Sequence, residues 1–203
     1  MKRGMIWFIS VFLFPGLCIA QAPHEIAGFA LGKNINEYKD RILTESDLPV
    51  RYLETLREVE IKEVEGFKSG LIIYGTCNEP GKILKIKLKY ADSSRAFYDA
   101  LLKRFKQRFG EPSEWRGDPF HIVINWKWSF TDKENNRISL HLQHNTRDLE
   151  EKLGNSVKLT MTSGIEAERH CFEAKHQSTE KPSMKGLSLK MMKEGDWERF
   201  IPQ

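Results

Sequence analysis

The residues best suited to chemistry lie together in one short loop, residues 115–121, which reads WRGDPFH. The loop holds a guanidinium, a carboxylate and an imidazole beside aromatic rings at the entrance to a predicted strand, and loops set against a rigid sheet often carry sites. Asp118 and His121 would form an acid and base pair, with Arg116 holding an anion. That arrangement would suit a small hydrolase.

The same loop has a structural interpretation, which we favour. Gly117 and Asp118-Pro119 supply turn geometry, Trp115 and Phe120 close the edge of the core, and Arg116 pairs with a nearby acid. An Arg-Gly-Asp triplet is too short to indicate cell adhesion.

A second candidate is the segment 82–90, in which Lys85, Lys87 and Lys89 alternate with apolar residues. This pattern predicts a strand with one apolar and one cationic face. The three lysines, together with Arg116, are the candidate ligand-binding residues, and they would hold an anionic partner such as an acidic protein, a lipid head group or a cell-wall polymer. The simpler interpretation, which we favour, is a solvated face, such as that of an edge strand protected by its lysines.

Three other groups of residues are weaker candidates. Trp126 and Trp128 project to the same side of a strand, as in a stacking platform, but their alignment with other apolar residues favours burial. His141 and His144 lie three apart on a strand and therefore on opposite faces, so they do not share a metal ion. Glu166 and His170 have helical spacing, which we interpret as a solvated helix face.

Catalytic and cofactor signatures are absent from the sequence. There is no G-x-S-x-G, H-E-x-x-H, phosphate loop, G-x-G-x-x-G or Cys-x-x-Cys. We therefore expect no cofactor and no metal, and we lean against an enzyme.

The first twenty residues have the pattern of a cleaved signal peptide. Lys2 and Arg3 precede a short apolar run that ends in Cys18-Ile19-Ala20. An uncleaved anchor needs about 20 apolar residues, and this shorter run is interrupted by Pro15-Gly16; Leu17 disfavours lipid attachment at Cys18. We expect an exported protein, periplasmic in a two-membrane envelope and otherwise extracellular, with no transmembrane segment after cleavage.

The cysteines and the charge agree with that prediction. Cleavage leaves Cys77 and Cys171, an even number, and we predict a disulfide between them, the alternative being two separate small apolar residues. The net charge falls from +4 to +2 because Lys2 and Arg3 leave with the signal, and this near balance argues against a nucleic-acid partner.

The remaining pattern predicts a single α+β domain at residues 24–177. Its elements are a short helix capped by Asn34, an entry segment that ends near Leu48-Pro49, three strands, a long amphipathic helix, three more strands and a last helix. The strands are expected at 58–65, 67–76, 82–90, 121–130, 137–144 and 157–162, and the long helix is stopped by Gly110. This order favours a mainly antiparallel sheet of about six strands, covered by two or three helices on one face.

Residues 178–203 are expected to form a flexible tail, which orders on a partner or has no role. The leading functional hypothesis is an exported, non-enzymatic protein that binds an envelope protein or an anionic ligand. The alternatives are the hydrolase of the 115–121 loop and a purely structural component of the envelope.

Overall fold

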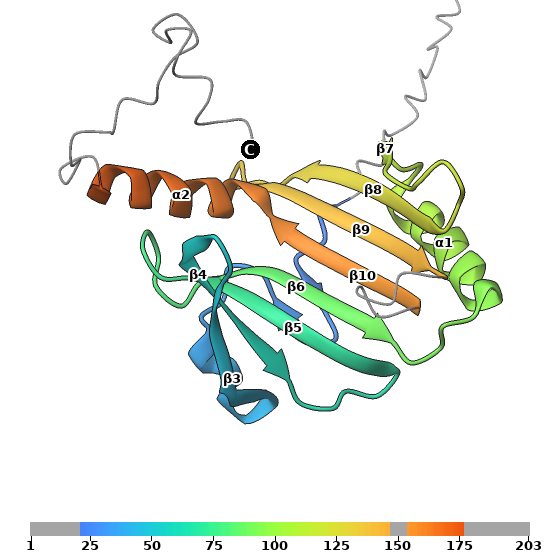
Figure 1. Cartoon of the computed structure of the whole chain (residues 1–203). Coiled ribbons are helices and arrows are strands. Elements are labelled where there is room, and N and C mark those ends of the chain that lie inside the picture. Colours follow the sequence, from blue (N-terminus) through green and yellow to red (C-terminus); the bar gives the residue numbers. More distant parts are fainter. Residues whose placement is uncertain (1–20, 147–153, 177–203) are drawn as a thin grey trace, which may run out of the picture.

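The computed structural model describes residues 21–146 and 154–176, and the predicted signal segment and C-terminal tail lie outside them. Its main feature is an eight-stranded antiparallel sheet in the order β3-β4-β5-β6-β10-β9-β8-β7 (Figure 1). The strands are β3 Ile42–Val50, β4 Leu53–Ile61, β5 Phe67–Gly75, β6 Ile83–Tyr90, β7 Glu114–Trp115, β8 Val123–Thr131, β9 Arg137–Asn145 and β10 Gly154–Met161. A small hairpin, β1 Glu25–Ile26 with β2 Phe29–Ala30, precedes them. The predicted antiparallel α+β fold is confirmed.

The expected count of about six strands was too low. The six predicted strands are all present with shifted ends, and the sequence analysis missed β3, β7 and the small hairpin. Leu48-Pro49 does not end the entry segment but lies inside β3, which is an edge strand. An edge strand tolerates proline because the missing N–H is not needed by a neighbour on the open side.

One face of the sheet carries the core. Apolar side chains form an unbroken row across six paired strands: Val59, Ile72, Ile86, Leu159, Leu140 and Trp128. All six are buried, and burying such a side chain contributes about 1.5–3 kcal/mol before the entropy of ordering it is subtracted. The apolar row fixes which face each of these six strands turns toward the core, because a shift of one residue in a strand would turn its apolar side chains toward water.

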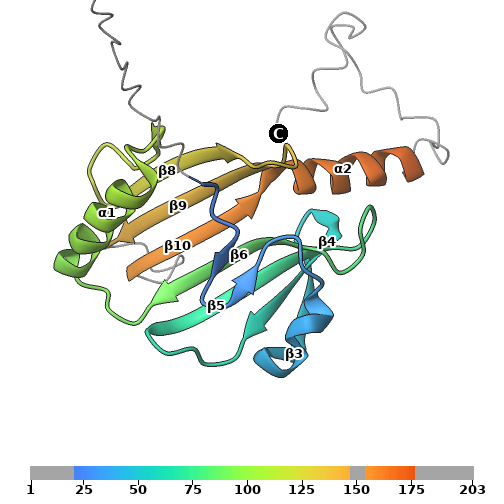
Figure 2. The ribbon, with the colours of Figure 1, turned by 180° about the vertical axis from the view of Figure 1, so that it is seen from behind.

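The long helix α1, Arg95–Phe109, and the N-terminal segment cover this apolar face (Figure 2). The Ser94 hydroxyl accepts a hydrogen bond from the Phe97 N–H, so it caps the helix, and Gly110 ends the helix with φ of 78°. The indole N–H of Trp128 donates to the Gly110 carbonyl at 2.8 Å. Tyr98, which the sequence analysis did not select, is the fully buried residue of α1, and its ring stacks on His144.

The predicted short helix is a 3-10 helix, η1 Ile35–Arg41, capped by Asn34 as expected. Asn34 and Glu37 form a reciprocal capping box, which satisfies two N–H groups that the helix itself leaves open. Phe29 and Leu31, just before the helix, are buried in the core, so the N-terminal segment is part of the domain.

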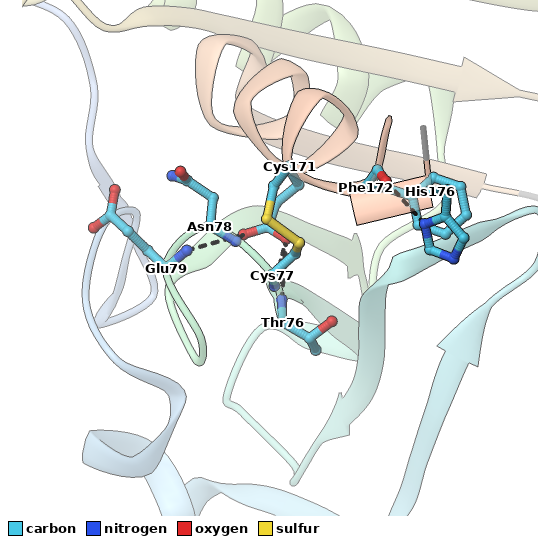
Figure 3. The surroundings of a disulfide bond; sticks show 8 residues. Thr76, Cys77, Asn78, Glu79, Cys171, Phe172 and His176 are labelled. Carbon is cyan, nitrogen blue, oxygen red and sulfur yellow. Dashed lines mark hydrogen bonds between the residues drawn. A yellow bond between two sulfur atoms is a disulfide. The ribbon is translucent and has the colours of Figure 1, made fainter. Parts of the chain in front are cut away.

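The last helix, α2 Thr162–His176, begins directly after β10. Two of its residues, about one turn apart, hold it to the loop between β5 and β6 (Figure 3). Cys171 forms the predicted disulfide with Cys77, with an S–S distance of 2.00 Å. The buried Glu168 carboxylate accepts the backbone N–H groups of residues 76–79 at 2.8–3.2 Å. Among the described residues, no helix is long and apolar enough to cross a membrane.

Replacing Glu168 by Ala should lower the free energy of unfolding by ~3 kcal/mol, because four part-buried N–H donors lose one charged acceptor at once. Urea unfolding under oxidising conditions measures the change. The control is Glu173→Ala, which removes an exposed carboxylate from the same helix and should cost well under 1 kcal/mol. Equal losses in the two variants would contradict the role given to Glu168.

Candidate functional site

The face of the sheet opposite the core carries cationic and polar side chains. Lys87, Lys158, His141 and Lys127 stand directly across from one another on β6, β10, β9 and β8. Lys85 and Lys89 flank Lys87 on its own strand. We call these six residues the basic face: Lys85, Lys87, Lys89, Lys127, His141 and Lys158. Figure 1 looks onto this side of the sheet, and none of the described helices lies across it.

The basic face is in the middle of the sheet and not at its rim. β6 is hydrogen-bonded to β5 on one side and to β10 on the other, so the edge-strand interpretation of its lysines is wrong. Protection of an exposed edge therefore does not account for Lys85, Lys87 and Lys89. Their role as ligand-binding residues stays a prediction.

The lysines of β6 are half-buried, and this changes their electrostatics. Burial lowers the pKa of Lys85, and the neighbouring charge of Lys87 lowers it further, while Glu58 on β4 acts in the opposite direction. Each cation on this face is thus less hydrated than a free lysine, which favours the approach of a negative group.

His141 is the most enclosed member of the basic face, with 8 % of its surface exposed. Burial lowers its pKa to about 4, and Lys158, Lys127 and Arg116 add to the effect, while Glu114 acts in the opposite direction. The ring is therefore neutral near pH 7. Its Nδ1 lies 3.2 Å from the Asn125 Oδ1, which gives the imidazole a fixed orientation within the sheet.

Among the hollows on this side of the sheet, two are lined by Lys87. A small cavity of about 50 Å³ is lined by Lys87, His141, Gln143, Ser156 and Lys158. A wider groove of about 800 Å³ lies beside the β4–β5 hairpin, and Lys87 and Lys89 belong to its lining as well. Lys87 thus borders both hollows.

The 115–121 loop uses its chemical groups for its own turn. The Asp118 carboxylate accepts the backbone N–H groups of Phe120 and Val123. These hydrogen bonds lower the pKa of Asp118, and the one from Val123 has the largest effect. Arg116 pairs with Glu114 at 2.8 Å. A carboxylate held ionised in this way is a poor proton donor.

His121 is exposed, with its ring 5.7 Å from that of Trp115, and its φ of 55° fits a tight turn. These contacts support the interpretation of the loop as a structural turn, and the acid and base roles of Asp118 and His121 stay a prediction. One part of the structural interpretation is wrong: Phe120 is 83 % exposed and does not close the edge of the core.

The other candidates also have definite places. Trp128 is buried against Phe105, and Trp126 is partly buried with the Lys106 ammonium 5.9 Å from its ring, as the core interpretation predicts. His144 faces the core and His141 faces the basic side, so the two imidazoles point apart. On α2, Glu166 forms an ion pair with Arg137, and the His170 Nδ1 lies 3.4 Å from the Glu173 carboxylate. Within 21–146 and 154–176, no three His, Cys, Asp or Glu side chains gather as a metal site.

The sequence analysis missed Lys127, Lys158 and His141 as neighbours of the β6 lysines. The signal was present, because each lies between apolar residues of a predicted strand and so must face away from the core. What the sequence did not supply was the strand order, which places β10 and β9 directly beside β6.

The comparisons with known proteins add no assignment. No protein-family model, curated protein or solved structure matches this chain. The site is therefore argued from its own geometry.

His141 should make the fold less stable in acid. Its pKa is about 4 in the folded chain and about 6.5 in an unfolded one, so the unfolded state binds more protons between these values. Stability should fall as the pH drops from ~6.5 to ~4, by roughly 2 kcal/mol after allowing for solvent screening at this open face.

Urea unfolding of the protein and of its His141→Gln variant between pH 7.5 and pH 4 measures this effect. The variant should lose that part of the pH dependence while keeping the part due to carboxylates. Identical pH dependence in both proteins would contradict it.

Proposed function

We propose that this chain is an exported, non-enzymatic protein that binds an anionic partner in the cell envelope or the surrounding medium through its basic face. The observation that carries the proposal is the cross-strand pair of Lys87 and Lys158, on a side of the sheet that no described helix covers. Lys127, two strands from Lys158 in the same row, already forms an ion pair with Glu114 at 3.2 Å.

The physical argument concerns the spacing of the charges. Neighbouring strands are about 4.8 Å apart, and two like charges at that distance repel by about 0.9 kcal/mol even in water, and more where they are half-buried. Lys87 and Lys158 occupy directly paired positions, where like charges destabilise a sheet. A negative group bound between them relieves this repulsion, so the same arrangement that weakens the free protein strengthens its complex.

Export rests on the pattern of residues 1–20, and the Cys77–Cys171 disulfide is compatible with an oxidising compartment. The binding role is preferred over the hydrolase because Asp118 and Arg116 are engaged by the 115–121 loop itself. It is preferred over a purely structural role because like charges at the directly paired positions of Lys87 and Lys158 weaken a free sheet.

Export should leave Gln21 as the first residue of the recovered protein, because Ala20 gives the signal peptidase a small residue before the cut. N-terminal sequencing of the protein from the envelope or medium tests this. A chain that begins at Met1 and is recovered from the cytosol with free thiols would contradict the proposed compartment.

Replacing Lys85, Lys87 and Lys89 together by Gln should lower the salt concentration at which the protein elutes from immobilised dextran sulfate. The reason is that fewer cations then release counterions from the anionic polymer. The control is the triple variant Lys39→Gln, Lys103→Gln and Lys133→Gln, which loses the same charge at exposed positions outside the basic face.

Equal elution of the two triple variants would show that only net charge matters, and this would overturn binding through the basic face. Far-ultraviolet circular dichroism of both variants establishes that the fold is retained.

A further inference from the structure

We propose that the small cavity bordered by Lys87, His141 and Lys158 receives a carboxylate of an extended acidic peptide, whose chain continues into the groove beside the β4–β5 hairpin. This inference rests on the proposed function and names the class of partner.

The size of the cavity selects a single functional group. About 50 Å³ exceeds the ~30 Å³ that one water occupies in the liquid, and it is far below the ~300–1,000 Å³ of a pocket for a whole small molecule. One carboxylate fits this range. Everything else in the ligand must lie outside the cavity.

The lining of the cavity has the chemistry of a carboxylate site. Lys87 and Lys158 supply positive charge from paired positions on adjacent strands. Ser156 and His141 are each nine-tenths buried, and Gln143 adds an amide. An oxyanion thus meets two cations and several neutral polar groups, as in charge-assisted recognition.

The groove explains why the rest of the ligand is a peptide. Its lining combines apolar side chains such as Val64, Phe67 and Leu71 with charges of both signs. The charged residues are Glu60, Glu63, Lys62, Lys68, Lys87 and Lys89. A uniformly anionic polymer would gain nothing from the apolar side chains, and it would meet Glu60 and Glu63 as well as the lysines. A peptide that has one acidic residue for the cavity, and apolar and polar residues on either side of it, matches both the apolar and the charged side chains of the groove.

The register of the sheet connects the two hollows. One cross-strand row runs from the groove to the cavity. It begins at Leu71 in the groove and continues through the cavity residues Lys87, Lys158 and His141. Three strand spacings of about 4.8 Å make ~14 Å, which an extended chain crosses in about four residues. The peptide therefore lies across the strands and contacts side chains, without adding a strand to the sheet.

The test uses two pools of fluorescein-labelled octapeptides with blocked termini, randomised except at the fourth position, which is Glu in one pool and Gln in the other. Fluorescence anisotropy at fixed ionic strength should show about tenfold tighter binding of the Glu pool, the size expected for one charge-assisted contact. Lys87→Gln should abolish the preference, and Lys103→Gln, an exposed change on α1, should keep it.

Lys85→Gln gives a finer comparison, because Lys85 shares the strand and face of Lys87 but lines neither hollow. It should reduce the preference much less than Lys87→Gln. A second measurement needs no variant. The α-amide of N-acetylglutamate should shift the His141 ring resonances saturably, whereas the α-amide of N-acetylglutamine, which has no carboxylate, should not do so at equal ionic strength.

Equal binding of the two pools, or equal shifts with the two amino-acid probes, would overturn the peptide inference. If dextran sulfate retention still depends on the β6 lysines in that case, the basic face binds an anionic polymer and the proposed function stands. If retention on dextran sulfate also no longer depends on the β6 lysines, the peptide inference and the proposed function are both wrong.

Discussion

The alternation of side chains along β6 is the constraint on which the other features of this molecule depend. Leu84, Ile86 and Leu88 must be buried, so Lys85, Lys87 and Lys89 must face the other way. Because β6 lies inside the sheet, this choice sets the facing of β5 and β10 through their hydrogen bonds, and of β9 and β8 beyond them. The cationic surface is thus the geometric counterpart of the core.

A second constraint attaches α2 to the loop between β5 and β6. The loop between β5 and β6 turns four backbone N–H groups toward one point, and without an acceptor these donors would be costly to bury. Glu168 meets all four, and the disulfide of Cys171 lies one helical turn away. Together they attach α2 to the end of β5 and the start of β6, so the strand that carries three of the basic residues is anchored at one end.

The sequence predicted those features that depend on local periodicity. The strand of Lys85, Lys87 and Lys89, the long helix that ends at Gly110, the cap at Asn34 and the disulfide all follow from spacing or residue type and are confirmed. β3 was missed because its pattern is irregular: Pro49 and an interrupted register with β4 hide the alternation.

The sequence predicted the lysines of β6 but not their neighbours on the adjacent strands, for a different reason. Lys87 and Lys158 are 71 positions apart, and strand order, which local pattern does not encode, makes them neighbours. The enclosure of His141 has the same origin, since it arises from Lys158 and Lys127 on either side. Glu168 gave no signal at all, because its sequence context is that of an ordinary charged position on a surface helix.

The electrostatics of the basic face argue for a bound state and against a merely solvated surface. Exposed lysines lose little by being close together, because water screens them. The β6 lysines are half-buried, and the pKa of Lys85 is lowered by burial and by Lys87, which means that the free protein holds Lys85 in an unfavourable environment. His141 between Lys158 and Lys127 adds a polar group without adding charge. A surface that only had to stay soluble would place its lysines at the exposed rim, where hydration is complete; half-buried cations at the centre of a sheet gain most when an anion replaces the water that they have lost.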